Sequence, residues 1–264
     1  MERLRHLARA GSLEHAVLVQ EGAAALAALG DDRAALLLAC RRLLERHGGS
    51  GPLWSLCARM LCSDDPRSEA WACTEEIDAD DSAAHLASEL LPDATVVVLG
   101  WPELAAPALA CRGDLRVLVV DAPGDGVEVV RWLRQRGVDA VEVPAAGVAA
   151  AVAGADQIVL EADAVGPNEV LAVVGSVAAA AVAAHVGAPV WVVAGAGRVL
   201  PPALWVDVVL RQRPPAPWLA TREVVALALA GAVVRPDGLF RLPAVLPPDC
   251  PLAPELLSSS PGGG

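Results

Sequence analysis

The sequence predicts an α/β fold: a Rossmann-like doubly wound parallel sheet preceded by a small helical N-terminal domain. Five short runs rich in Val, Ile and Leu predict the strands, and they cover residues 94–100, 115–123, 138–144, 156–163 and 188–195. Four stretches between these runs are each long enough for a helix. Strongly apolar strands that alternate with helices are typical of a parallel sheet covered on both faces. Right-handed crossovers would place helices on both faces of this sheet.

The first 91 residues predict the helical domain. Apolar residues recur every three or four positions in segments that we expect to be helical, namely 13–30, 31–49, 50–66 and 69–91. Gly30 and Gly48 are expected just beyond the ends of the first two helices. Asp31 or Asp32 is expected to cap the start of the second helix.

The sheet domain is expected to span residues 92–250, and 251–264 is expected to be a disordered tail. Within the sheet domain, the fourth connecting helix is expected in 166–187. A further edge strand is expected in 204–214, and a short helix in 221–234.

Composition excludes several classes of protein. The formal net charge is −12 with no basic stripe, which disfavours nucleic-acid binding. The six cysteines form no CxxC pair and have no His at ligand spacing, so we expect no metal site. The chain has no Walker A motif, no GxGxxG and no GxSxG, and we expect no cofactor. All twenty basic residues are Arg, which indicates the coding bias of a GC-rich bacterium.

Localisation is predicted from two segments. The N-terminus has no apolar signal segment, so the expected location is the cytoplasm, with free thiols. Residues 170–197 are apolar, but Gly187 and Pro189 interrupt them. A buried helix, a turn and a buried strand suit this pattern better than a transmembrane span.

The segment VLEADAVGPNEVLAVVGS and the residues after it carry a resemblance to a known family. Ala162-Asp163 ends a predicted strand, Asn168 lies in a short loop, Gly175-Ser176 opens a small-residue helix, and His185–Pro189 forms a turn before the next strand. This order and spacing resembles the signature of the family of methylthioribose-1-phosphate isomerase, ribose-1,5-bisphosphate isomerase and the regulatory subunits of initiation factor 2B.

The chain also departs from the pattern of that family. Gly100-Trp101 stands where the isomerases carry a reactive Cys, and Ala122-Pro123-Gly124 replaces a segment with a ligand-facing Arg. Val173-Val174 replaces an Asn-Lys pair. The reactive Cys, the Lys and the ligand-facing Arg of that family are therefore missing.

The resemblance implies a role for Asp163 as the acid–base group that moves a proton between two carbons of an open sugar phosphate. Glu161 lies two residues earlier, so both carboxylates would point to one face of the strand, and burial would raise a carboxyl pKa towards neutrality. Asn168, Gly175 and Ser176 are candidate ligand contacts, and Arg198 is a candidate phosphate ligand. Alternatively, Asp163 caps the following loop and Glu161 faces solvent.

The residues discussed above are compatible with two functions. The first is a divergent isomerase-like enzyme acting on a small phosphorylated metabolite through Asp163. The second is a non-catalytic protein, similar to the initiation-factor subunits, that binds a small molecule or assembles. The resemblance also implies a homodimer.

Overall fold

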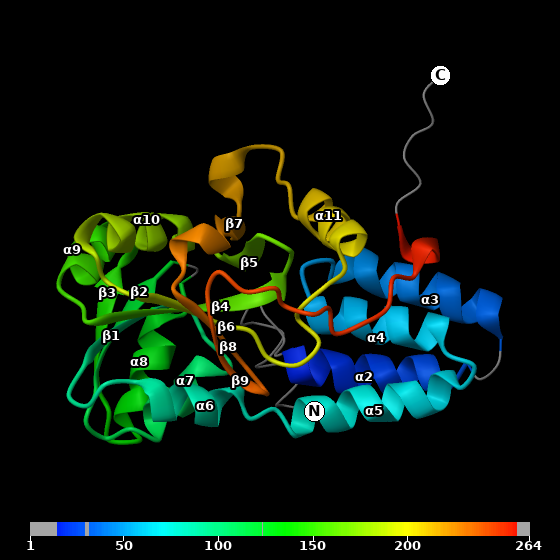
Figure 1. Ribbon diagram of the computed structural model, residues 1–264, viewed down its shortest axis with the longest axis horizontal. Coiled ribbons are helices and arrows are strands. Elements are labelled where there is room, and N and C mark those ends of the chain that lie inside the picture. Colours follow the sequence, from blue (N-terminus) through cyan, green and yellow to red (C-terminus); the bar gives the residue numbers. More distant parts are fainter. Residues whose placement is uncertain (1–14, 30–31, 123, 258–264) are drawn as a thin grey trace.

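The computed structural model describes residues 15–29, 32–122 and 124–257 (Figure 1). The α-helices of this part are α2 (His15–Ala27), α3 (Arg33–Arg46), α4 (Gly51–Cys62), α5 (Pro66–Asp78), α6 (Ser82–Glu89), α7 (Ala105–Ala110), α8 (Gly126–Arg134), α9 (Val148–Ala153), α10 (Ser176–Val186) and α11 (Pro202–Arg211). The strands are β1 (Thr95–Leu99), β2 (Arg116–Asp121), β3 (Asp139–Pro144), β4 (Gln157–Val165), β5 (Glu169–Val173), β6 (Val190–Val193), β7 (Arg222–Ala226), β8 (Ala232–Arg235) and β9 (Gly238–Arg241).

The central sheet has the strand order β3-β2-β1-β4-β6-β8-β9. Its first six strands pair in parallel, and β9 pairs antiparallel with β8. Helices α9 and α10 cover one face of this sheet, and α6, α7 and α8 cover the other (Figure 1). The predicted fold class, a mostly parallel α/β sheet with a helical N-terminal region, is confirmed.

The five strands predicted from apolar runs are β1, β2, β3, β4 and β6. Val96, Val97 and Val98 of β1 are fully buried because helices pack on both sides of the strand. This double burial explains why the sequence of a central strand shows continuous rather than alternating apolar residues.

The expected helix over 166–187 is wrong in its first half. Residues Glu169–Val173 form β5, which pairs antiparallel with β4 after a register shift between Ala162 and Ala164. The helix α10 starts only at Ser176, after Gly175 adopts a left-handed φ of 95°. The turn at residues 166–168 therefore closes a hairpin, because a longer β4 extends past the sheet and offers β5 a partner.

The two segments that follow were assigned to the wrong class. Residues 204–214 were expected to form an edge strand, but Pro202–Arg211 is helix α11, with Pro at its first turn. Its buried residues Leu204, Trp205 and Val208 pack on the helical N-terminal layer. Residues 221–234 were expected to be helical but contain β7 and β8, because β5 and β6 offer them exposed edges.

Helices α2 to α5 pack into a layer beside the sheet (Figure 1). Asp32 caps α3 as predicted, since its carboxylate accepts from the backbone N–H groups of Ala34 and Ala35. Gly30 and Asp31 lie outside the described residues. Residues 251–257, predicted as part of a disordered tail, instead pack on this layer: Leu256 is buried and the Arg41 guanidinium donates two hydrogen bonds to the Glu255 carbonyl. The rest of the predicted tail, 258–264, lies outside the described residues.

Candidate functional site

The carboxyl end of β4 meets the start of α4, and a cluster of charged side chains fills this junction. A Cβ atom added at Gly51, the first residue of α4, would lie 2.8 Å from the backbone oxygen of Asp163 and 3.0 Å from the Cα atom of Arg198. Only glycine fits this close approach. The helical layer therefore contacts the sheet at the place where ligands of parallel sheets bind.

Asp163 is bound by partners from both sides of this junction. Its Oδ1 atom lies 3.1 Å from His15 Nε2, and its Oδ2 atom accepts a hydrogen bond from the guanidinium of Arg222. Burial raises the pKa of the Asp163 carboxyl, but the hydrogen bond from His15 and the charge of Arg222 outweigh burial and lower that pKa to about 2. The expectation that this carboxyl would titrate near neutrality is therefore wrong, and Asp163 stays ionised.

His15, the first residue of α2, connects three elements. Its Nδ1 atom lies 2.8 Å from the hydroxyl of Ser50, and its backbone N–H donates to Glu103 at 2.9 Å. Burial raises the pKa of the Glu103 carboxyl, although the nearby His15 and Arg198 lower it. The start of α2 is thus tied to the α4 start, to β4 and to the segment after β1.

Glu161 lies two residues before Asp163 on β4 and has different partners. Its carboxylate accepts hydrogen bonds from the backbone N–H groups of Glu103, Leu104 and Ala105 at 2.8–3.1 Å, at the start of α7. It also accepts from Arg198 at 3.2 Å. Glu161 therefore binds the positive end of a short helix and does not pair with Asp163 as an acid–base couple.

Arg198 is buried, with only 3% of its surface exposed. Its guanidinium donates to the Ala162 carbonyl at 2.5 Å and lies 3.8 Å from Glu103 as well as near Glu161. Burial lowers the pKa of this guanidinium, but the negative charges of Glu161 and Glu103 outweigh burial and raise it. The cation predicted to bind a phosphate is thus paired within the protein.

Two further helices at these strand ends start against a carboxylate of the chain itself. The backbone N–H of Val177, in the first turn of α10, donates to Glu223 at 2.5 Å. The backbone N–H of Gly126, the first residue of α8, donates to Asp121 at 3.0 Å. Helix starts of this kind bind anionic ligands in many proteins. In this chain, internal carboxylates hold the corresponding N–H groups.

The other predicted ligand contacts are dispersed. Gly175 is the residue before α10, and a Cβ added there would lie 3.2 Å from Leu99. The Ser176 hydroxyl is buried and has no hydrogen-bond partner among the described residues. Asn168 is exposed in the β4–β5 turn and makes none of the hydrogen bonds that join Asp163 to its partners.

His15, Ser50 and Arg222 were missed by the sequence reasoning. His15 lies 148 residues from Asp163 in the chain, and Arg222 lies in a segment that was expected to be helical. A glycine followed by proline at 51–52 was the one local signal, since Pro is common in the first turn of a helix. It marks the helix start but says nothing of what that start contacts.

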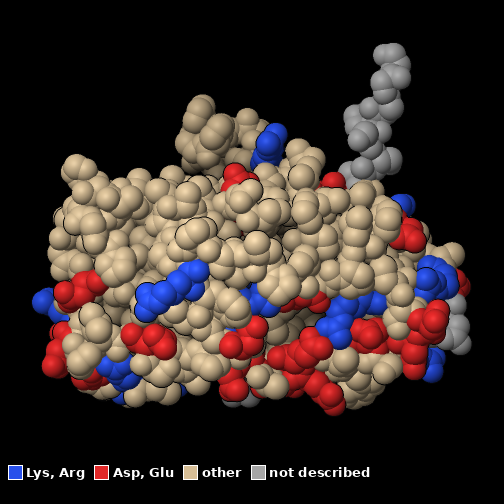
Figure 2. Space-filling model, in the orientation of Figure 1, with Lys and Arg blue, Asp and Glu red and all other residues tan. Residues whose placement is uncertain are grey.

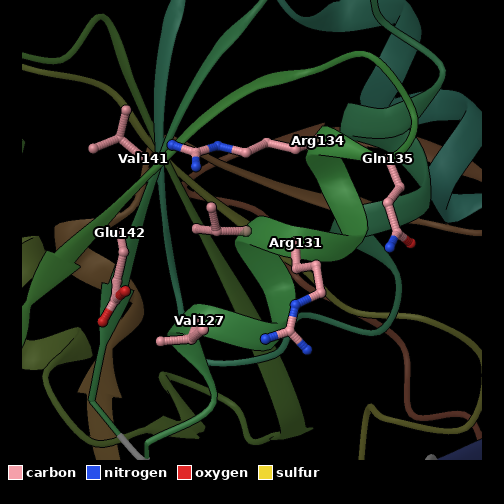
Figure 3. Close-up of a pocket in the computed structure, with 7 residues that line it drawn as sticks. Val127, Arg131, Arg134, Gln135, Val141 and Glu142 are labelled. Atoms are coloured by element: carbon pink, nitrogen blue, oxygen red, sulfur yellow. The ribbon is translucent and has the colours of Figure 1, made fainter.

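A separate cavity of about 640 Å³ lies between α8 and the edge strand β3 (Figure 3). Its lining residues are Val127, Val130, Arg131, Arg134, Gln135, Val141 and Glu142. Strands β2 and β1 separate β3 from β4, so this cavity does not include the Asp163 cluster.

Within the described ranges, no group of three His, Cys, Asp or Glu residues is placed to hold a metal ion. Nor does any described helix have the length and apolar character needed to span a bilayer.

A mostly parallel Rossmann-like sheet with a helical layer at its strand ends defines the structural class of this chain. No family model matches the sequence, and no curated protein matches it. Solved structures of initiation factor subunits do match.

Translation initiation factor eIF-2B of Pyrococcus horikoshii OT3 has a TM-score of 0.73 at 15% identity, covering 86% of this chain and 90% of that chain. The eIF2B beta subunit of Chaetomium thermophilum has a TM-score of 0.62 at 18% identity, covering 91% and 85%. The tetrameric eIF2B-beta2-delta2 complex of C. thermophilum contains a chain with a TM-score of 0.64 at 17% identity, covering 86% and 84%. The chain therefore has the fold of initiation factor 2B subunits, and the predicted resemblance is confirmed at the level of the fold.

Proposed function

We propose that this chain is an assembly protein with the initiation-factor-2B fold and that it does not isomerise sugar phosphates. The observation that carries this proposal is the hydrogen bond from the Val177 backbone N–H to Glu223. It puts a carboxylate at the start of α10, where the sequence predicts ligand contacts at Gly175 and Ser176. A phosphate entering there would meet a fixed negative charge instead of a free helix start.

The state of Asp163 supports the same conclusion. An isomerase base must accept a proton from substrate carbon, which requires a carboxyl pKa nearer to the working pH. The pKa of the Asp163 carboxyl is lowered to about 2, and Arg222 and His15 already use both of its oxygens. The alternative function, aldose–ketose isomerisation by Asp163, would require substrate to displace these partners.

A sparsely charged surface supports assembly with a second copy of the chain. The upper part of the view in Figure 2 carries few charges, whereas acidic and basic side chains gather in its lower part. Large exposed apolar residues of α10, α11 and the segment that follows α11 are Val177, Val206, Leu210, Trp218 and Leu219. Contact through this surface would bury apolar side chains. It would also hold the acidic regions of the two chains, each of net charge −12, away from each other. Trp205 of α11 is buried and does not contribute to this surface.

The isomerase question is tested by incubating the protein with methylthioribose 1-phosphate or ribose 1,5-bisphosphate and following ketose formation by NMR. We expect no turnover by the wild-type protein or by an Asp163→Asn variant. Turnover that Asp163→Asn abolishes would overturn the proposal.

Assembly is tested by size-exclusion chromatography with light scattering. We expect a dimer or larger species for the wild-type protein and a shift towards the 27.0 kDa monomer for a Leu210→Ser, Trp218→Ser double variant. The matched control is Trp71→Ser, which removes an exposed tryptophan on α5, outside this surface. A wild-type protein that is monomeric at all concentrations would contradict the assembly proposal.

A further inference from the structure

Ser50, His15 and Asp163 form a continuous relay of hydrogen bonds across the junction of α2, α4 and β4. The Ser50 hydroxyl lies 2.8 Å from His15 Nδ1, and His15 Nε2 lies 3.1 Å from Asp163 Oδ1. A hydroxyl, an imidazole and a carboxylate in this order are the groups that activate a serine nucleophile. Neither isomerisation nor assembly requires this arrangement.

The partners decide where the imidazole proton lies. An ionised carboxylate only accepts hydrogen bonds, so the His15 nitrogen that faces Asp163, Nε2, must carry its hydrogen. In neutral His15 the other nitrogen, Nδ1, then has a free lone pair directed at the Ser50 hydroxyl. This is the protonation state in which an imidazole acts as the base for a serine.

The position of Ser50 suits a nucleophile. It is the N-cap residue of the twelve-residue helix α4, yet its hydroxyl makes no capping hydrogen bond to this helix. The hydroxyl is bound to His15 instead. The positive end of the α4 dipole therefore lies beside the Ser50 oxygen, where it would stabilise the negative charge that develops on the carbonyl oxygen of an ester bound to Ser50.

We propose that Ser50 is the nucleophile of an acyl-transfer site that accepts small carboxylic esters. The Ser50 oxygen bonds to the ester carbonyl carbon while its proton passes to His15 Nδ1, and Asp163 stabilises the resulting imidazolium. The ester C–O bond breaks, and the leaving alcohol takes the proton from His15. Water repeats both steps on the acyl-serine, which releases the carboxylic acid and restores the Ser50 hydroxyl.

Burial limits the size of the substrate. Ser50 is 4% exposed, and the side chains of His15 and Asp163 are 13% and 15% exposed. The Arg222 side chain, bound to the other oxygen of Asp163, is 26% exposed and marks the more open side of the relay. A short acyl group such as acetyl fits this restricted access better than a long chain.

The test uses the full chain with two probes, a small fluorophosphonate and p-nitrophenyl acetate. We expect one phosphonyl adduct on Ser50 by peptide mass mapping, and hydrolysis of the ester that Ser50→Ala reduces to the background rate. His15→Gln should lower the rate of labelling about 100-fold, which is the usual size of a general-base contribution. The matched control is Ser55→Ala, which removes another buried serine of α4 whose hydroxyl donates to the Gly197 carbonyl and does not contact His15.

The outcomes separate the relay from a purely structural network. Label on Ser50 that survives Ser55→Ala and is slowed by His15→Gln supports the proposal. The proposal is overturned by a wild-type protein without label on Ser50, by labelling that His15→Gln leaves unchanged, or by ester hydrolysis that Ser50→Ala leaves unchanged. If Ser50→Ala does not fold, the mapped label on the wild-type protein and its rate in His15→Gln decide the question. None of these readouts depends on the isomerase or assembly assays.

Discussion

The carboxylate of Asp163 and the imidazole of His15, 148 residues apart in the chain, are joined by a hydrogen bond of 3.1 Å. One belongs to the sheet and the other to the first described helix. Arg222 completes the contact by binding the second oxygen of Asp163. The residue that the sequence identifies as the centre of the site thus also connects the helical layer to the sheet.

Asp163→Asn is expected to lower the free energy of unfolding by about 3 kcal/mol, because removing one partner of a buried charge pair leaves the others unpaired. Urea denaturation followed by circular dichroism measures this change. The matched control is Asp139→Asn, which removes an exposed carboxylate 3.8 Å from Arg116. Such a surface pair contributes less than about 1 kcal/mol. Equal losses in the two variants would show that Asp163 is not a stabilising contact.

Acid should weaken the wild-type protein through Asp163. The folded-state pKa of this carboxyl, about 2, is below its unfolded value, so its stabilising effect is present above about pH 4. This effect is lost as the pH falls from about 4 to 2, because near pH 2 the Asp163 carboxylate of the folded protein also becomes protonated. Urea midpoints measured across this range should fall more steeply for the wild-type protein than for Asp163→Asn. Parallel curves would contradict the lowered pKa of Asp163.

Gly51→Ala should destabilise the protein even though alanine is the better helix former. The added Cβ atom would meet the backbone of Asp163 at 2.8 Å and that of Arg198 at 3.0 Å, and neither can move freely. A loss of about 2 kcal/mol is expected from such overpacking. Gly113→Ala is the control, because a Cβ atom there meets nothing within 4 Å. Thermal melts of both variants compare the two sites directly.

Glu223→Ala should create a weak phosphate site at the start of α10. The substitution removes the carboxylate that the Val177 backbone N–H binds, and the helix start is then free to bind an anion. A phosphate titration should raise the melting temperature of this variant but not that of the wild-type protein, since a ligand that binds only the folded state stabilises it. Glu75→Ala, which removes an exposed carboxylate of α5, serves as the control. A phosphate response in the wild-type protein would mean that Glu223 does not block the site.

The predictions that succeeded rest on local patterns with one interpretation. Runs such as Val96–Leu99 are apolar at every position, and only a strand covered on both faces suits so short a run. The predictions that failed concern residues 169–173, 204–214 and 221–234. These segments have similar Val and Leu content. Whether a segment forms a strand depends on the unpaired strand edge that β4, β5 or β6 presents to it.

The contrast at Asp163 has the same physical origin. The amino-acid order of residues 156–198 is enough to identify a strand that contains Asp163 and a small-residue helix further on, because both depend on contacts between near neighbours in the chain. The partners His15, Ser50 and Arg222 come from elements far away in the chain, and no local spacing relates them to Asp163. Only folding brings these residues together. His15 and Arg222 then lower the pKa of the Asp163 carboxyl, which burial alone would raise. A carboxylate's position follows from its own strand, whereas its chemistry follows from the charges that tertiary packing places around it.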